Sequence, residues 1–342
     1  MRILVVGAGA VGSFLAWVLA RAGEDVVLLR RGAGAPSPAD LVVVGPSGAS
    51  RHARVTVAGV ADDVRDDDAV DVAIVAVKQY DVPAALEELA ALPATAVVTT
   101  QNGIGAEEAA ADARPGGVVI AASLTASVER DADDRVRWLR RGGLGLAPFV
   151  GDARTVAERL AVAFRAGSLS TDLLADARAM KWSKLLANLV ANATSGLLDL
   201  DSTTIYAHPG LFDVERAQLR EALAVMRAIA LRPVDIPGAR VQLLALATAL
   251  PTPLARLALR RVVGSARGGK DPSLRGAVEA GGRTEIAWLN GAVAREATRL
   301  GVPAPVNARL AALVDEASTD PARRDWFRGR PDLLLEAIGR VR

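Results

Sequence analysis

The chain has 342 residues, of which 51% are hydrophobic, and its 41 Lys and Arg residues nearly balance 39 Asp and Glu residues. This length and hydrophobic content are typical of a globular protein with a large core and predict two domains. The net charge of +2, without a long basic run, argues against a nucleic-acid-binding surface. Because the chain has no Cys, disulfides and thiolate zinc sites are excluded.

The N-terminal stretch predicts a dinucleotide-binding βαβ unit. A β-type run over residues 2–6 leads into three glycines at G-x-G-x-x-G spacing, and an apolar helical segment follows until Gly23. Such glycines allow a tight turn and a close approach to a pyrophosphate, and the helix N-terminus provides free N–H groups. The glycines also argue against a signal peptide, so we expect a cytoplasmic protein. The predicted cofactor-binding loop consists of Gly7, Ala8, Gly9, Ala10, Val11 and Gly12.

The end of the next predicted strand, over residues 25–29, indicates which dinucleotide binds. Sites specific for NAD usually place an acid here to hold the ribose hydroxyls, whereas this strand ends in Arg30 and Arg31. A guanidinium pairs with the 2′-phosphate of NADP, which an acid would repel. We therefore predict NADP(H), with Arg31 preferred over Arg30 as the phosphate-binding residue. The alternative is that one or both arginines are solvated loop charges.

The few histidines and tyrosines exclude several dehydrogenase chemistries. His52 lies in a polar loop and His208 precedes a proline, so we interpret both as surface residues rather than catalysts. Neither Tyr80 nor Tyr206 has the Lys four residues later that short-chain dehydrogenases need. If this protein transfers hydride, a Lys is therefore the leading candidate for the proton donor.

Two polar positions follow later strands of the first domain. A predicted buried strand over 70–77 ends at Lys78, and a strand over 96–100 runs into Gln101 and Asn102. Because open α/β sheets bind ligands at the C-terminal ends of their strands, we expect Lys78 and Asn102 to face the cofactor site. A hairpin at 41–58, strands at 117–122, 136–139, 143–147 and 168–173, and helices at 82–92 and 152–166 complete the predicted domain.

From about residue 176 the periodicity becomes helical. The predicted fold class is therefore an α/β N-terminal Rossmann-type doubly wound sheet at 1–173 and an all-α C-terminal domain at 174–342.

The first predicted helix, 176–197, carries a cation and two amides at i, i+4 and i+8, on one face. This stripe suits a polar ligand, but a solvent-facing stripe has the same pattern. The predicted stripe consists of Lys184, Asn188 and Asn192. Further helices are predicted at 209–230, 237–249, 274–280, 285–300 and 307–317, with 241–250 in the core or at a subunit contact.

These residues in combination resemble the ketopantoate reductase family, the 2-dehydropantoate 2-reductases. The resemblance covers nearly the whole chain, and the Lys-Asn-Asn stripe with the Thr-Glu-Ile run is its specific part. It implies an NADP-dependent oxidoreductase that acts on CH–OH groups in cytoplasmic pantothenate biosynthesis. Its partner would be a small 2-oxo acid, with no nucleic acid or membrane, and the chain would act alone or as a homodimer. The matching positions are the glycine loop, Lys78, Gln101-Asn102-Gly103, the stripe, Ser273, Thr284-Glu285-Ile286 and Asn290-Gly291.

The resemblance also implies a role for each matched residue. NADPH lies over the glycine loop, with Arg31 and Lys78 near its phosphates and Asn102 touching both cofactor and substrate. Lys184 contacts the substrate and donates the proton to its carbonyl oxygen, and Glu285 lies close to the nicotinamide ribose and the reacting centre. The substrate's carboxylate and hydroxyl groups are held by Asn188, Asn192 and Ser273.

Three positions on the substrate side depart from the family pattern. Lys270 stands where the family often has Asn, Pro272 replaces a second Ser, and Ala277 stands where an Asp is common. These departures leave hydride transfer as the expectation and leave another 2-oxo acid open as the substrate.

Two further classes share part of the pattern. A β-hydroxyacid dehydrogenase-like or imine-reductase-like enzyme has the same two domains and often Lys-x-x-x-Asn, but it usually lacks the second Asn and the Thr-Glu-Ile run. A non-catalytic NADPH-binding sensor would keep the glycines and Arg31, but it would not need Lys184, Asn188 and Glu285.

Overall fold

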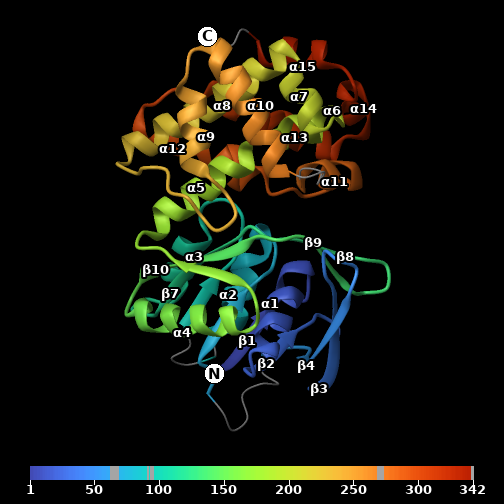
Figure 1. Cartoon of the computed structure of the whole chain (residues 1–342), viewed down its shortest axis with the longest axis vertical. Helices are drawn as coiled ribbons and strands as arrows, with labels where there is room; N and C mark the ends of the chain where they lie inside the picture. Colours follow the sequence, from blue (N-terminus) through green and yellow to red (C-terminus); the bar gives the residue numbers. More distant parts are fainter. Residues whose placement is uncertain (62–68, 91, 93–95, 268–272, 340–342) are drawn as a thin grey trace. The chain divides into compact units, whose positions relative to one another are not determined.

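The computed structural model describes residues 1–61, 69–90, 92, 96–267 and 273–339, and it divides into two compact units (Figure 1). The division falls within the helix α5 (Ala177–Leu189). The domain boundary that we predicted between residues 173 and 174 stays a prediction. The first unit comprises Met1–Gln101, Gly105–Lys181 and Ile236–Gly238, and the second comprises Asn102–Ile104, Trp182–Asp235 and Ala239–Arg342.

The first unit is built on one mixed β-sheet. Its described strands are β1 (Arg2–Val6), β2 (Asp25–Leu29), β3 (Ser37–Val44), β4 (Ser50–Ala58), β5 (Val72–Val75), β6 (Ala96–Thr99), β7 (Val119–Leu124), β8 (Ser127–Arg130), β9 (Val136–Arg140), β10 (Gly143–Val150) and β11 (Ser170–Leu173). They are ordered β11-β10-β7-β6-β5-β1-β2-β4-β3-β9-β8. The central strands β4, β2, β1, β5, β6 and β7 run parallel, in the order of a doubly wound dinucleotide-binding fold. This confirms the predicted fold class of the N-terminal part.

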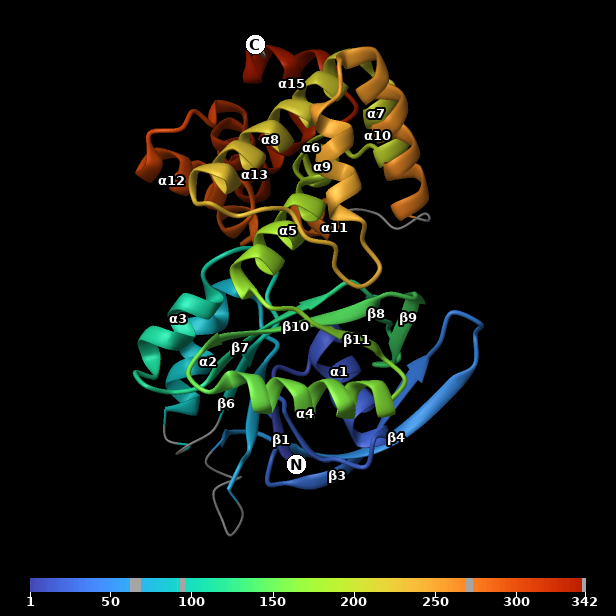
Figure 2. The same cartoon turned by 60° about the vertical axis from the view of Figure 1, so that its left-hand side comes forward.

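Helices cover both faces of this sheet because alternate strand residues point to opposite sides. Ile3 and Val5 pack in one core with α1 (Ala10–Arg21) and α4 (Ala153–Ala166). Leu4 and Val6 pack in a second core with α2 (Val82–Leu89) and α3 (Ala106–Ala113). Figure 2 shows α4 lying across one face of the sheet. The buried strands therefore leave the loops after β1, β2 and β5 at one common edge.

The described regular elements of the second unit are all helical, as predicted. None of the described helices is long and apolar enough to cross a membrane. After α5 come α6 (Asn192–Leu198), α7 (Ser202–Ala207), α8 (Pro209–Ala228), α9 (Val241–Ala249), α10 (Thr252–Arg267), α11 (Ser273–Ala280), the 3₁₀ turn η3 (Ile286–Trp288), α12 (Asn290–Leu300), α13 (Pro305–Thr319), α14 (Pro321–Phe327) and α15 (Pro331–Ile338).

The prediction of one continuous helix over 176–197 is wrong. Ala191 has a left-handed conformation with φ of +50°, and it separates α5 from α6. The buried carboxylate of Glu215 stabilises this break, because it accepts hydrogen bonds from the Ala191 amide and the Thr194 hydroxyl, both at 2.6 Å. Lys184 and Asn188 therefore share a helix, whereas Asn192 begins the next one.

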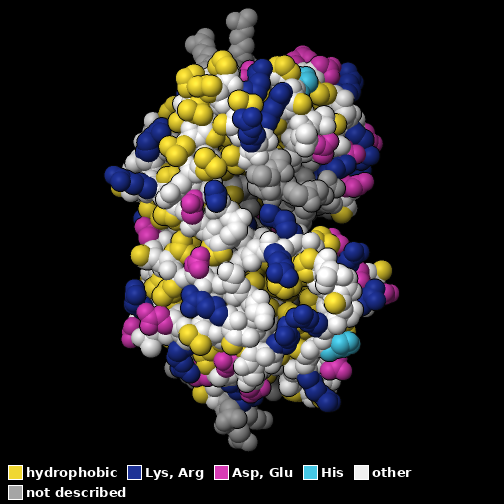
Figure 3. All heavy atoms as spheres, viewed as in Figure 1, with side chains coloured by type: hydrophobic (Ala, Val, Ile, Leu, Met, Phe, Trp, Pro, Cys, Tyr) yellow, Lys and Arg dark blue, Asp and Glu magenta, His cyan; other side chains and the backbone are white. Residues whose placement is uncertain are grey.

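The helix α9 has one face in the core and one in solvent. Val241 and Leu244 are buried, whereas Leu243 and Leu246 are 45% and 67% exposed. Figure 3 shows hydrophobic side chains gathered at the upper left of the second unit, where Figure 1 places α9. The core prediction for 241–250 is thus confirmed for one helix face.

Candidate active site

The glycine loop has the geometry that a dinucleotide needs. Gly7 has a φ of +107°, and a Cβ atom on Gly12 would lie 1.9 Å from the Gly7 carbonyl oxygen. Only glycines therefore fit where the loop turns and packs on α1. A Cβ atom on Gly9 would meet nothing within 4 Å, so the space beside the backbone of Gly9 is open. The helix α1 begins at Ala10 without a side-chain cap, which leaves N–H groups for an anion. These residues fit a bound pyrophosphate.

The two arginines after β2 make different ion pairs. Arg31 is 83% exposed at its side chain, and its Nη2 lies 3.5 Å from Oδ2 of Asp81. The amide of Asp81 donates to the carbonyl oxygen of Lys78 at 2.9 Å, so the segments of Arg31 and Lys78 meet at the edge of the sheet. Arg30 instead lies 3.2 Å from Asp134.

A buried ionic cluster lies at the end of β6, and we did not predict it from the sequence. The ammonium of Lys181 is 2.9 Å from the Glu107 carboxylate and donates to the Gln101 carbonyl oxygen at 2.5 Å. Thr99 donates to the same carboxylate at 2.6 Å. Burial raises the pKa of the adjacent carboxyl, Glu108. The cluster fixes the backbone immediately before Asn102.

Asn102 and Asn188 are brought together within the second unit. The Asn188 amide donates from Nδ2 to Oδ1 of Asn102 at 3.0 Å. Next to them, Ile104 donates its amide to the Trp288 carbonyl oxygen at 3.1 Å. A Cβ atom on Gly103 would lie 2.3 Å from that oxygen, so this close approach requires glycine. The structure thus joins the Gln-Asn-Gly run to the turn that follows Thr284-Glu285-Ile286.

Asn192 and Ser273 also meet, at the start of α11. Asn192 accepts a hydrogen bond from the Leu274 amide at 3.0 Å, and its Nδ2 lies 3.5 Å from the Ser273 hydroxyl. Asn192 is buried and Ser273 is exposed, so this pair combines a fixed amide with an accessible hydroxyl. Of the positions that depart from the family pattern, Ala277 lies on α11, whereas Lys270 and Pro272 lie outside the described residues.

Lys184 and Glu285 both lie in the second unit and are half-buried. Lys184 is on α5, between the buried residues Ser183 and Leu185, and Glu285 immediately precedes η3. Partial burial keeps such side chains accessible while it restricts their hydration. His208 caps α8, because its Nδ1 accepts a hydrogen bond from the Leu211 amide at 3.2 Å, which agrees with a non-catalytic role.

The other matched asparagine, Asn290, is fully buried. It donates to Gln218 at 2.8 Å and to Asn307 at 3.0 Å. Since these contacts satisfy both of its N–H donors, Asn290 packs the interior of the second unit instead of facing a ligand.

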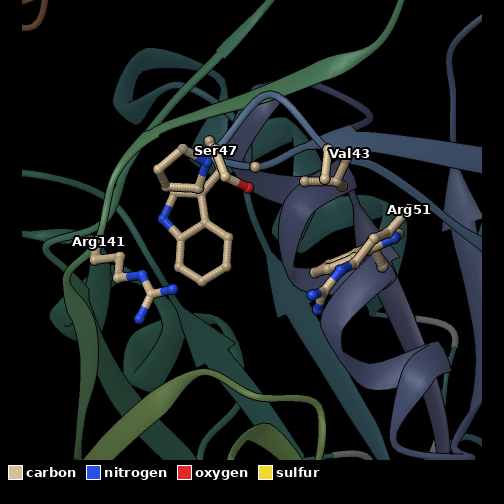
Figure 4. A pocket seen from close by; sticks show the side chains of 9 residues that line it. Val43, Ser47, Arg51 and Arg141 are labelled. Atoms are coloured by element: carbon tan, nitrogen blue, oxygen red, sulfur yellow. The ribbon is translucent and has the colours of Figure 1, made fainter.

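A separate small pocket lies in the first unit. Figure 4 shows Arg51 and Arg141 on opposite sides of it. The predicted site residues are not among its lining residues, which are Trp17, Val43, Gly45, Pro46, Ser47, Ala49, Arg51, Trp138 and Arg141.

The glycine loop, the parallel sheet and the helical second unit together define a dinucleotide-binding protein of the oxidoreductase type. The family model "Ketopantoate reductase PanE/ApbA" matches residues 3–151, and its C-terminal counterpart matches residues 176–318. A 2-dehydropantoate 2-reductase from Halobacterium salinarum is 30% identical over 327 residues, which cover 94% of this chain and 100% of that protein. The chain therefore belongs to the ketopantoate reductase family, a family of oxidoreductases.

Solved structures agree with this assignment. A PanE/ApbA family ketopantoate reductase from Ralstonia eutropha JMP134 has a TM-score of 0.75 at 25% identity, covering 96% of this chain and 99% of that one. A 2-dehydropantoate 2-reductase from Geobacter metallireducens GS-15 has the same TM-score and identity, covering 93% and 100%. A D-mandelate dehydrogenase in complex with NADH and anilino(oxo)acetate shares the fold, with a TM-score of 0.76 at 20% identity and coverage of 96% and 99%.

Proposed function

We propose that this chain catalyses the NADPH-dependent reduction of 2-dehydropantoate to pantoate, with Lys184 as the proton donor. The observation that carries the proposal is the convergence of Asn102, Asn188 and the turn after Glu285 within one unit. These residues come from three distant parts of the sequence, and a protein that only bound NADPH would not need them together.

The proposed site binds two ligands. Gly7–Gly12 would hold the nicotinamide dinucleotide, and Arg31 and Lys78 would bind its phosphates. Asn102 and Asn188 orient the substrate through their side-chain amides, and Asn192 with Ser273 binds its carboxylate and hydroxyl groups. Charged acceptors such as a carboxylate form the stronger hydrogen bonds with these groups.

The chemistry follows from where charge develops. The bound nicotinamide supplies a hydride to the carbonyl carbon. Negative charge then builds on the carbonyl oxygen, where the Lys184 ammonium stabilises the charge and donates its proton. Glu285 would bind the nicotinamide ribose next to the reacting centre.

A direct test is NADPH consumption, followed by near-ultraviolet absorbance, with a panel of 2-oxo acids that includes 2-dehydropantoate. We expect the fastest turnover with 2-dehydropantoate and with NADPH rather than NADH. If the chain reduces only another 2-oxo acid, that acid replaces 2-dehydropantoate as the proposed substrate. Cofactor binding without turnover of any 2-oxo acid would favour a sensor. The cytoplasmic location and the homodimer stay predictions.

A further inference from the structure

Arg130 contacts the glycine loop, although nothing in its sequence context suggested a binding role. It is the last residue of β8, and its Nη1 donates to the carbonyl oxygen of Ala8. Its Nε lies 2.6 Å from Oδ1 of Asp134. A guanidinium carries more N–H donors than these two contacts use, so Arg130 keeps donors for a further acceptor at the loop.

Asp134 connects this arginine to the end of β2. Its second carboxylate oxygen lies 3.2 Å from Nη2 of Arg30. One carboxylate thus lies between two guanidinium groups, one at the glycine loop and one at the strand end. The side chains of Arg30 and Asp134 are 52% and 51% exposed, so solvent screens this pair and the pair separates at little cost.

The turn that carries Asp134 is well defined. Asp131 accepts hydrogen bonds from the amides of Asp133 and Arg135, both at 3.0 Å. Asp134 itself has a left-handed φ of +64°. The turn therefore holds the Asp134 carboxylate near both arginines.

In this fold the pyrophosphate of a dinucleotide lies at the glycine loop and the adenosine ribose at the end of the second strand. Arg130 lies at the glycine loop, and Arg30 lies at the end of β2. A carboxylate at the ribose position accepts hydrogen bonds from free ribose hydroxyls and repels a 2′-phosphate. In the Arg30–Asp134 pair, the guanidinium thus suits a ribose with a 2′-phosphate, and the carboxylate suits a ribose with free hydroxyls.

We propose that Arg130 is a cofactor-binding residue that pairs with the pyrophosphate, and that Asp134 sets the choice between phosphorylated and unphosphorylated ribose. This inference rests on the proposed function, because it takes the nicotinamide dinucleotide to bind at the glycine loop. The pyrophosphate binds the Arg130 donors that Ala8 and Asp134 leave unused, and the 2′-phosphate, when present, displaces the Asp134 carboxylate from Arg30.

The test measures binding of NADP⁺ and NAD⁺ to the full chain by titration calorimetry at low salt, without a substrate. Arg130→Met should weaken both nucleotides by a similar factor, about 10-fold or more, because both carry the pyrophosphate. Asp134→Asn leaves the Arg130–Ala8 contact in place. It should tighten NADP⁺ several-fold and leave NAD⁺ unchanged or weaker.

Asp133→Asn is the matched control, because Asp133 lies on the same turn but pairs with Arg135 at 2.6 Å. It should leave both affinities within about twofold of the wild type. Thermal unfolding of each variant without nucleotide establishes that it is folded before the titration. Equal effects of Asp134→Asn on both nucleotides, or unchanged binding by a folded Arg130→Met variant, would overturn this inference but not the proposed function. A wild-type chain that binds neither nucleotide would overturn the proposed function as well.

Discussion

The ammonium group of Lys181 lies 2.9 Å from the carboxylate of Glu107, and these side chains are only 3% and 2% exposed. Each charge of such a buried pair compensates the other for its lost hydration. Removing one of them leaves the other uncompensated and destabilises the fold. Lys181 also donates to the backbone of Gln101, so the pair links the start of α5 to the segment before Asn102.

We expect Lys181→Met to destabilise the first unit by about 3–5 kcal/mol, because it leaves the Glu107 carboxylate buried without a counter-charge. Adding Glu107→Gln should recover part of this loss. Urea unfolding of the single and double variants measures both effects. Arg114→Met is the control: it removes hydrogen bonds to the carbonyls of Leu89 and Leu92 but leaves no buried charge. A Lys181 variant that loses no more stability than this control would contradict the prediction.

Lys184→Ala should lower kcat by about 10²–10⁴-fold, the usual contribution of a general acid. NADPH affinity should stay near the wild-type value, because the proposed phosphate-binding residues are unchanged. Steady-state kinetics and a separate binding titration distinguish the two quantities. Near-normal turnover in the variant would show that another group donates the proton.

Asn188→Ala should raise KM for the 2-oxo acid by about 10-fold or more, as expected for the loss of a hydrogen bond to a charged group. It also removes the partner of Asn102. The measurement compares KM for the acid with the dissociation constant for NADPH, which should change less. Gln242→Ala removes an exposed amide from α9 and should alter neither value. Equal kinetics for both variants would argue against a substrate role for Asn188.

The stability of the second unit should depend on the ionisation of Asp201. Hydrogen bonds from the Thr204 hydroxyl and amide hold the pKa of Asp201 below its usual value, and the carboxylate caps α7. Because its folded pKa is lowered, its stabilisation is present at neutral pH and is lost as the pH falls through the folded pKa. Asp201→Ala should therefore cost about 1 kcal/mol at pH 7 and progressively less in acid. Urea unfolding across pH measures this, and Asp201→Asn should retain most of the cap at pH 7.

Local sequence patterns were sufficient to predict the fold where the chain forms regular elements around a short motif. The apolar β-type run over residues 2–6, followed by Gly7 and Gly12, predicted the strand, the turn and the helix correctly. Because β2 and β5 both run parallel to β1, their C-terminal ends lie at one edge of the sheet. Such features depend on neighbours within a few residues, which the sequence displays directly.

The errors arise where distant residues decide the local structure. The break at Ala191 depends on Glu215, which is buried on another helix. The Asn188 and Asn192 stripe consequently spans two helices, which helical spacing alone did not reveal. Arg130 and Lys181 look like ordinary surface charges in sequence, and only their partners Ala8 and Glu107 give them a place in the fold. The apolar neighbours Met180 and Trp182 were the available signal that Lys181 is buried.

The assignment of Asn102–Ile104 to the second unit and of Ile236–Gly238 to the first has a consequence for the gene. The Trp288 carbonyl contacts the backbone at Gly103, and Thr125 donates to the Pro237 carbonyl oxygen. A hybrid made by joining the N-terminal half of this chain to the C-terminal half of a relative would bring unmatched residues together at both places. Recombination at the middle of the gene is therefore disfavoured, and homologous exchange would have to carry these two short peptides along with the unit to which they belong.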